Sequence, residues 1–348
     1  MLKHTTGIRA WLALGAASAV ALAGLAGCSE ENAQKAAAQQ GQRRTARAAT
    51  REPLLPLPEV QKLDAKRVAL GRRLFHEPRL SGDGKVACSS CHDLANGGDD
   101  GRPRPLGAHG KTGLVNAPTV YNAALNFVQF WDGRAATLED QVNGPLNNPL
   151  EMASSWPNAL GKLKADASYV KDFDECFADG LNEANVRVAI ADFERTLITR
   201  GSAFDRFLEG DQNALDAAAR SGYETFKSVG CIACHQGSNV GGNMFQRFGV
   251  LGDYFKDRGN VVEADYGRYN VTKNESDRFV FRVPSLRNVE HTAPYFHDGS
   301  AATLEQAVQV MARYQLGRKL GDEQVHGILA FLRSLSGPMV GAAAEPKP

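Results

Sequence analysis

The chain has 348 residues, of which 43% are hydrophobic and 23% are charged, and its formal net charge is +1 at pH 7. This length allows two domains with cores of their own, and the nearly neutral charge argues against a nucleic-acid-binding protein. The six cysteines do not form a disulfide framework, because four of them stand in two Cys-x-x-Cys pairs and the other two stand alone.

The N-terminus resembles the export signal of a bacterial lipoprotein. A basic start precedes an apolar run over residues 10–25, and small residues then lead to Cys28. We predict that residues 1–27 are a cleaved signal peptide and that lipidation of Cys28 tethers the protein to a bacterial membrane on the periplasmic side. An ordinary secretory signal and an uncleaved anchor helix are the alternatives. Residues 28–58 are rich in Ala, Gln, Arg and Pro, which predicts a flexible tether.

Two copies of Cys-x-x-Cys-His follow. At this spacing both sulfurs can reach the vinyl groups of one porphyrin, and the adjacent histidine can reach the iron, which is the signature of c-type haem attachment. Half of a zinc site or a thiol redox pair would not explain a histidine after both pairs. We therefore predict two covalent c-type haems. The copies consist of Cys88, Cys91 and His92, and of Cys231, Cys234 and His235.

An internal repeat accompanies the two motifs. Residues 132–139 recur as 298–305 with one difference, and residues 116–122 resemble 282–288 at the same spacing along the chain. This pattern indicates one haem module duplicated. We predict an all-α fold of two class I cytochrome c-like haem domains. The predicted domains are residues 59–206 and 207–340, followed by a disordered tail at 341–348.

Helical signals support this fold class. Residues 303–306 have the capping-box form, residues 137–140 are a near match, and both precede apolar-periodic runs. Residues 186–197 and 325–335 each keep one apolar helical face. No alternating strand run of convincing length is present. The long Gly-rich stretches, residues 97–113 and 237–252, are predicted to be loops that wrap the haems.

The two copies differ after the shared repeat. Met311 in the second copy corresponds to Pro145 in the first, and a thioether is a common sixth ligand of c-type haem iron whereas proline cannot ligate. The first copy instead offers Gln141 and Glu151, polar groups suited to a reacting small molecule. A core methionine and a solvated surface carboxylate are the plain alternatives, and Met244 is the rival ligand.

With these residues in view, the chain resembles the bacterial di-haem cytochrome c peroxidases and the related MauG-like di-haem enzymes. The resemblance covers roughly residues 60–336. It rests on both haem motifs and on the segments 116–119, 130–134, 148–152, 283–288 and 292–297.

The resemblance implies a role for each matching residue. His92 and His235 would be the proximal iron ligands, and Met311 the distal ligand of the high-potential haem. His109 matches the histidine that caps the peroxidatic haem in the resting enzyme, and Trp131 matches the proposed electron relay between the haems. The remaining matches are Gln141 and Glu151 over the peroxidatic iron, and Asn116, Thr292 and Pro294 at an inter-domain calcium site.

The resemblance also implies an activity. We expect reduction of hydrogen peroxide to water at the first haem, with electrons from a small redox protein, a cytochrome c or a cupredoxin, entering through the second. Glu151 would act as general acid and base, with Gln141 and Trp131 as further catalytic residues. A MauG-like oxidase acting on a protein is one alternative, although the closest such enzymes place a tyrosine at the position of Met311. A non-catalytic di-haem electron carrier is another, and a homodimer is the assembly that we consider.

Overall fold

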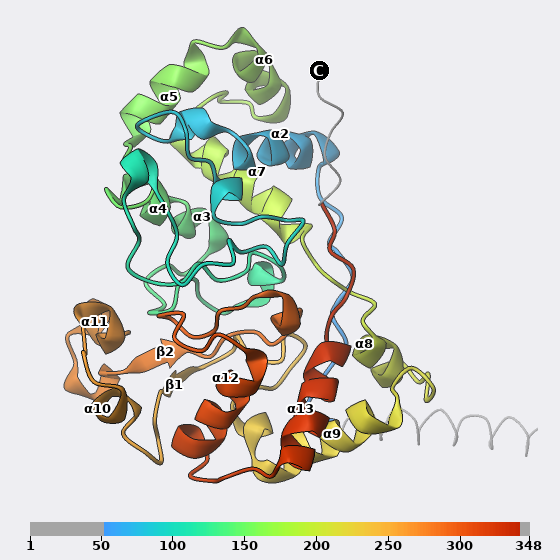
Figure 1. The fold of residues 1–348 in the computed structure, drawn as a ribbon. Coiled ribbons are helices and arrows are strands. Elements are labelled where there is room, and N and C mark those ends of the chain that lie inside the picture. Colours follow the sequence, from blue (N-terminus) through green and yellow to red (C-terminus); the bar gives the residue numbers. More distant parts are fainter. Residues whose placement is uncertain (1–51, 342–348) are drawn as a thin grey trace, which may run out of the picture. The chain divides into compact units, whose positions relative to one another are not determined.

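The computed structural model describes residues 52–341 (Figure 1). The predicted signal peptide, Cys28 and most of the predicted tether lie outside these residues, as does the predicted tail apart from Gly341. Within residues 52–341, no helix is both long enough and apolar enough to cross a bilayer.

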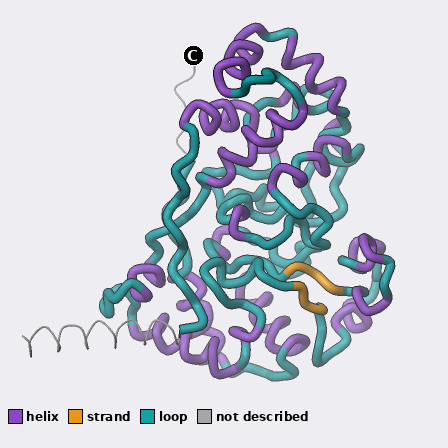
Figure 2. Tube along the Cα trace, turned by 180° about the vertical axis from the view of Figure 1, so that it is seen from behind, coloured by secondary structure: helices purple, strands orange, loops and turns teal. Residues whose placement is uncertain are grey.

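Helices and loops make up nearly all of the described chain (Figure 2). The only sheet within the described part pairs β1 (Phe245–Arg247) with β2 (Val280–Arg282) in antiparallel orientation. The sequence predicted no strand, and β1 falls inside a stretch that was expected to be loop. Three-residue strands are too short for alternation to reveal, and β2 is buried at all three positions.

The α-helices have the following bounds. Those before the second haem motif are α2 (Ala65–Phe75), α3 (Leu138–Gln141), α4 (Asn143–Asn147), α5 (Trp156–Lys164), α6 (Ala167–Cys176), α7 (Glu183–Arg195), α8 (Ala203–Leu208) and α9 (Ala217–Val229). Those after it are α10 (Tyr254–Arg258), α11 (Tyr269–Thr272), α12 (Leu304–Val310) and α13 (Asp322–Ser334).

Shorter helical turns connect these elements. The 3₁₀-helices are η1 (Pro78–Leu80), η2 (Cys88–Ser90), η3 (Ala108–Gly110), η4 (Ala123–Leu125), η5 (Cys231–Ala233), η6 (Glu263–Tyr266), η7 (Glu275–Asp277) and η8 (Val289–His291). A π-helix, η9 (Met311–Gln315), directly follows α12. Each haem motif thus begins with a 3₁₀ turn, η2 or η5.

The predicted helix starts are confirmed. The Thr303 side chain accepts the backbone N–H of Gln306 at the start of α12, and the Thr137 side chain accepts that of Asp140 at the start of α3. The apolar faces predicted within residues 186–197 and 325–335 are the buried faces of α7 and α13.

Two helix pairs organise the packing. Figure 1 shows α2 beside α7 and, elsewhere in the same unit, α9 beside α13. Each pair crosses at a glycine, because a Cβ on Gly71 would collide with the carbonyl of Ala189 and a Cβ on Gly222 with that of Gly327. One large hydrophobic core surrounds α2 and α7 and a second surrounds α9 and α13, so each haem motif has a core of its own nearby.

The described residues include a segment before residue 59, where the first domain was predicted to start. Leu54 and Leu57 are fully buried, and the backbone around Leu54 pairs with Gly237 just after the second haem motif. The end of the predicted tether is therefore packed against the second haem motif, because two leucines in a Pro-rich segment are enough to bury it.

A buried polar bridge links the equivalent positions of the repeat. Asn122 and Asn288 both adopt left-handed backbone conformations, with φ of 59° and 57°. The Asn122 side chain donates to the Thr199 hydroxyl at 2.9 Å, and that hydroxyl donates to the Asn288 side chain at 2.9 Å. Thr199 is fully buried, so the bridge is shielded from water.

A buried ion pair holds the segment around Leu55 and Leu57 against the rest of the fold. Arg287 lies 2.8 Å from Asp205, and both side chains are 0% exposed. Asp205 also accepts the backbone N–H of Leu57 at 3.0 Å, and Arg287 donates to the carbonyl of Leu55 at 2.9 Å. The guanidinium of Arg287 and the carboxylate of Asp205 therefore both have hydrogen-bond partners within the protein.

We predict that Arg287→Met destabilises the protein by roughly 3–5 kcal/mol, because Asp205 would remain as a buried charge without a partner. Denaturant unfolding of the mature protein measures the change. Lys66→Met is the matched control, since Lys66 pairs with Glu175 while the two side chains are 68% and 45% exposed. This control should lose less than about 1 kcal/mol. Equal losses in both variants would contradict the prediction.

Candidate active site

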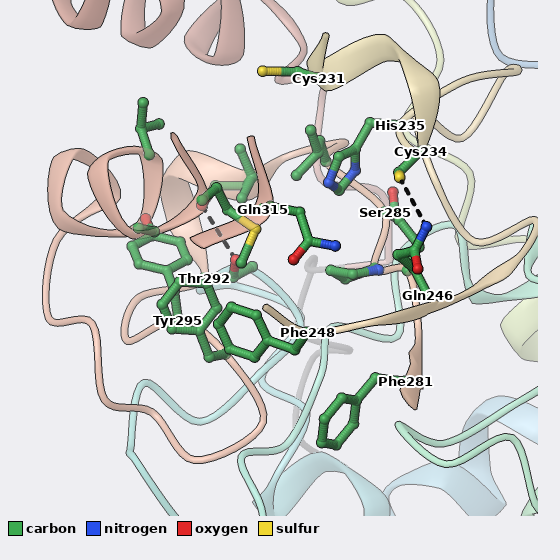
Figure 3. Close-up of a pocket in the computed structure, with 18 of the residues that line it drawn as sticks. Cys231, Cys234, His235, Gln246, Phe248, Phe281, Ser285, Thr292, Tyr295 and Gln315 are labelled. Carbon is green, nitrogen blue, oxygen red and sulfur yellow. Dashed lines mark hydrogen bonds between the residues drawn. The ribbon is translucent and has the colours of Figure 1, made fainter. Parts of the chain in front are cut away.

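The second haem motif opens into a cavity that both copies of the repeat line. Cys231, Cys234 and His235 lie on its wall, and Figure 3 shows Cys234 and His235 among the side chains that surround it. Predicted site residues from elsewhere in the chain line the same cavity, namely Asn116, Trp131, Thr292, Pro294 and Met311. The structure therefore brings together the predicted second haem site, relay residue and calcium ligands.

The two motif histidines have the same environment. Nδ1 of His92 lies 3.2 Å from the carbonyl of Gly98, and Nδ1 of His235 lies 3.3 Å from that of Val240. A donor bond from Nδ1 leaves Nε2 as the free ligand atom on each ring. Burial lowers the pKa of His92 and lowers that of His235 to about 4, so both rings stay neutral, as an iron ligand requires.

The surroundings of the motif cysteines favour neither reactive thiols nor a zinc site. Burial raises the pKa of Cys88 to about 12 and that of Cys231 to about 11, whereas reactive thiol pairs need a lowered pKa. Within residues 52–341, neither cysteine pair belongs to a cluster of three or more metal-ligating side chains. These findings disfavour both alternatives to haem attachment.

The cavity also suits the charge of a haem. Arg282 on β2 is 3% exposed and lines the cavity, and its Nε donates to the carbonyl of Phe130 at 3.2 Å. Burial lowers the pKa of Arg282 to about 10, and no carboxylate contributes to this shift. A buried cation in the wall of a largely apolar cavity fits an apolar ring that carries propionate groups.

Met311 begins the π-helix η9 and lines the cavity, whereas Met244 is not among its lining residues. A π-turn inside a helix often marks a functional site, because it re-aims one side chain. In the first copy, α3 ends at Gln141, and the short α4 carries Pro145 where the second copy has Met311. The geometry thus favours Met311 over Met244 as a ligand.

Trp131 and His297 meet at the wall of the cavity. Their rings are T-shaped with centroids 6.5 Å apart, and they occupy equivalent positions of the repeat. Asn116 holds both, because its carbonyl accepts the indole N–H of Trp131 at 2.9 Å and its backbone N–H donates to the carbonyl of His297 at 2.8 Å. The Asn116 side chain donates to the carbonyl of Arg102 at 2.9 Å.

A buried network of charged side chains is hydrogen-bonded to the imidazole ring of His297. Its Nε2 lies 2.7 Å from Asp265, and Arg258 contacts both Asp265 and Asp298 at 2.5 Å. Burial alone would raise the pKa of Asp265, but the bonds from His297 and Arg258 hold it well below its usual range. Asp265, His297 and Asp298 could geometrically hold a metal ion, but the Arg258 guanidinium already occupies the space between the carboxylates.

Glu151 lies beside the first haem motif. The pKa of Cys91 is raised by burial, by the charge of Asp100 and, third, by the charge of Glu151. Glu151 and Cys91 are therefore close. Burial raises the pKa of Glu151, while Arg134 and a 2.6 Å hydrogen bond from Asn148 oppose the rise. A carboxyl group with a raised pKa holds its proton to a higher pH than a free one, which suits a general acid. The described hydrogen bonds do not join Gln141, at the end of α3, to Glu151.

His109 lies in the turn η3 and is exposed. Its backbone is left-handed, with φ of 58°, and its N–H donates to Asp83 at 2.9 Å. The preceding residue, Ala108, donates its backbone N–H to the carbonyl of Glu151 at 2.6 Å. The His109 turn is therefore anchored to the segment that carries Glu151, and ligation of iron by His109 stays a prediction.

Sequence reasoning missed several buried carboxyl groups, among them Glu194 and Asp99. Glu194 on α7 is 6% exposed and close enough to Cys88 for its charge to raise the pKa of that thiol further, after burial. The sequence did hold a signal for this burial, because Glu194 lies four residues after Ile190 and thus on the apolar face of α7. Asp99, at 1% exposure, lies in a Gly-rich segment that shows no such pattern.

Glu194 gives a pH-dependent prediction. Burial raises its pKa from 4.5 to about 8. Between these values the unfolded chain releases the proton while the folded protein keeps it, so this group's effect on stability becomes less favourable as pH rises, by roughly 1.4 kcal/mol per pH unit. Glu194→Gln should match the wild type at pH 5 and exceed its stability at pH 8 in urea unfolding. Glu175→Gln, at an exposed site, is the control and should show no such gain.

Comparison with known proteins gives concordant matches. The family model described as di-haem cytochrome c peroxidase matches residues 65–213. The chain is 49% identical over 287 residues to the cytochrome c peroxidase Ccp of Escherichia coli, covering 82% of this chain but only 61% of that protein. It is 46% identical over 290 residues to the cytochrome c551 peroxidase of Nitrosomonas europaea, covering 83% and 85% of the two chains. A solved structure of a MauG-like protein associated with microbial copper homeostasis matches with a TM-score of 0.73 and 28% identity, over 81% of this chain and 93% of the other.

Proposed function

The chain belongs to the di-haem cytochrome c peroxidase family, and we propose that it reduces hydrogen peroxide to water with electrons from a small redox protein. The reaction takes one peroxide, two electrons and two protons and yields two waters. The observation that carries the proposal is the difference between the two halves. Met311 faces the cavity of the second motif, whereas Glu151, with a raised pKa, stands beside the first.

When bound, each haem supplies an iron centre that exchanges electrons, and the first would also supply the coordination position for peroxide. We propose that the chain holds them through thioethers from its four motif cysteines and through Nε2 of His92 and His235. The carbonyl bonds to both Nδ1 atoms support this assignment, because they fix the ring orientation and the tautomer.

Glu151 is the proposed catalytic acid. Cleavage of the peroxide bond needs a proton on the departing oxygen, and a partly buried carboxyl group with a raised pKa holds its proton to a higher pH than a free one. Asn148 orients the carboxyl group through its 2.6 Å hydrogen bond. Gln141 is proposed as a second polar group over the same position, and the exposed His109 turn is proposed as the element that covers it in the resting enzyme.

Trp131 is the proposed relay between the halves. It comes from the first copy of the repeat yet lines the cavity of the second motif, and Asn116 fixes its indole N–H. We propose that residues 59–206 form the peroxidatic domain and residues 207–340 the electron-transfer domain, related by duplication. The matching left-handed asparagines, Asn122 and Asn288, support this relation.

A calcium ion is proposed at Asn116, Thr292 and Pro294. The family resemblance suggests the site, and the residues fit a hard cation because an amide oxygen and main-chain carbonyls are the donors that it prefers. Thr292 and Pro294 line the cavity together with Asn116. The unpaired buried carboxylate of Asp99, close to His291, is a further sign that positive charge belongs here.

We further propose a periplasmic location with a lipid anchor at Cys28. The donor is proposed to be a cytochrome c or a cupredoxin, and a homodimer is the proposed assembly. The sequence pattern of the N-terminus supports the anchor.

A MauG-like oxidase acting on a protein is the second candidate, because a MauG-like structure matches most of the chain. Met311 favours the peroxidase, since the related oxidases place tyrosine at this position. An electron carrier would instead need a permanent sixth ligand in the first half.

The Glu151→Gln variant tests the proposed acid. We predict that peroxide turnover with a reduced cytochrome c falls by about 10²–10⁴-fold while both haems stay bound. The raised pKa also predicts that wild-type activity declines as pH rises and the carboxyl group loses its proton, and that the variant lacks this decline. Glu175→Gln, at an exposed carboxyl group on α6, is the control. Wild-type rates in Glu151→Gln would refute the role.

The Met311→His variant tests whether Met311 is the ligand that gives the second haem its higher potential. A thioether ligand raises the haem potential relative to imidazole, so the variant should show a lower potential for one haem and slower electron entry. Redox titration followed in the visible spectrum measures both haems. Met244→Leu is the control and should leave both potentials unchanged, whereas a shift in this control alone would transfer the ligand role to Met244.

A further inference from the structure

The carboxylate of Asp99 is buried without a side-chain partner. The residue is 1% exposed, and no side chain donates to either of its carboxylate oxygens within the described residues. Backbone N–H groups of Asp99 and Gly101 act to lower its pKa, but burial outweighs them. The charged groups that act on it most are Asp93 and Asp100, which are also acidic. Burial of an uncompensated carboxylate costs several kcal/mol, so a buried carboxylate normally pairs with a cation or binds a metal ion.

Asp99 faces the segment that carries two of the proposed calcium ligands. Gly97 marks the contact, because a Cβ there would collide with the carbonyl of His291 and would lie 3.2 Å from Oδ1 of Asp99. The charge of Asp99 also contributes, after burial, to the raised pKa of Tyr295. Thr292 and Pro294 lie between His291 and Tyr295 in the chain, so Asp99 lies against this short segment.

The same turn contacts the third proposed ligand. Three residues after Asp99, the carbonyl of Arg102 accepts the side-chain N–H of Asn116 at 2.9 Å. The amide oxygen of Asn116 is therefore turned away from Arg102. Asp99, Asn116 and the segment 291–295 thus converge from three parts of the chain, and they offer carboxylate, amide and main-chain oxygens.

We propose that Asp99 is the anionic group of the calcium site, acting on the cation either directly or through a water bound to it. The inference rests on the calcium site proposed above and adds a protein carboxylate to it, since Asn116, Thr292 and Pro294 contribute only neutral oxygens. Asp99 has no cation beside it, and the proposed site would supply one.

Asp99→Asn tests the proposal in the full-length protein with both haems. The protein is freed of divalent cations with a chelator and titrated with calcium chloride in a calorimeter. We expect calcium to bind about 10–100-fold more weakly to the variant than to the wild type. Asp100→Asn is the matched control, because Asp100 is the adjacent carboxylate and accepts the backbone N–H of Arg102. This control should keep the wild-type affinity.

Thermal unfolding gives a second readout that does not depend on activity. In the chelated state, Asp99→Asn should be at least as stable as the wild type, because the unpaired charge is gone. With calcium the wild type should gain more in melting temperature than the variant. Asp99→Ser is a second neutral variant in case Asp99→Asn does not mature.

The outcomes separate this inference from the calcium site itself. If calcium does not bind the wild type, both proposals fail. If Asn116→Ala weakens calcium binding and Asp99→Asn does not, the calcium site stands and the role of Asp99 is wrong. If Asp99→Asn lowers the melting temperature equally with calcium and with chelator, Asp99 is a structural group only. Selective loss of affinity in Asp99→Asn supports the proposal.

Discussion

The peptide group and side chain of Asn116 are the point on which the arrangement of the site depends. Its carbonyl accepts the indole N–H of Trp131, its backbone N–H donates to the carbonyl of His297, and its amide group donates to the carbonyl of Arg102. Three separate loops are therefore positioned by one buried residue. Because loops without regular secondary structure have few internal hydrogen bonds, such shared contacts decide where their side chains lie.

Several buried charges of the described chain lie at the haem motifs or at the cavity. Glu194 lies near Cys88, Arg282 lines the cavity of the second motif, and Asp265 bonds to His297 and Arg258. Burying charge is costly, so such groups are more typical of a functional site than of a stabilising core. The apolar cores around α2 with α7 and around α9 with α13 carry the stability that offsets this cost.

Sequence could predict the features that depend on local spacing. The haem motifs, the N-caps at Thr137 and Thr303 and the apolar faces of α7 and α13 are all periodic or contiguous patterns. The family was also recognisable, because the matching segments surround these motifs. Asp99, Asp265 and Arg282 were not predictable in this way, since their meaning comes from neighbours that lie far away in the sequence. The pair β1 and β2 was missed because three residues cannot show alternation.

The bridge from Asn122 through Thr199 to Asn288 has a consequence for motion. It ties equivalent positions of the two repeats through one buried hydroxyl, which receives a hydrogen bond from one asparagine and gives one to the other. If the two halves moved apart at a hinge here, these bonds would break where water could not replace them. Rigid-body opening at this point is therefore disfavoured. We expect any rearrangement that accompanies a change of oxidation state to occur instead in exposed turns such as that of His109. The spacing of the two haem motifs would then stay constant throughout a catalytic cycle while only their covering loops move.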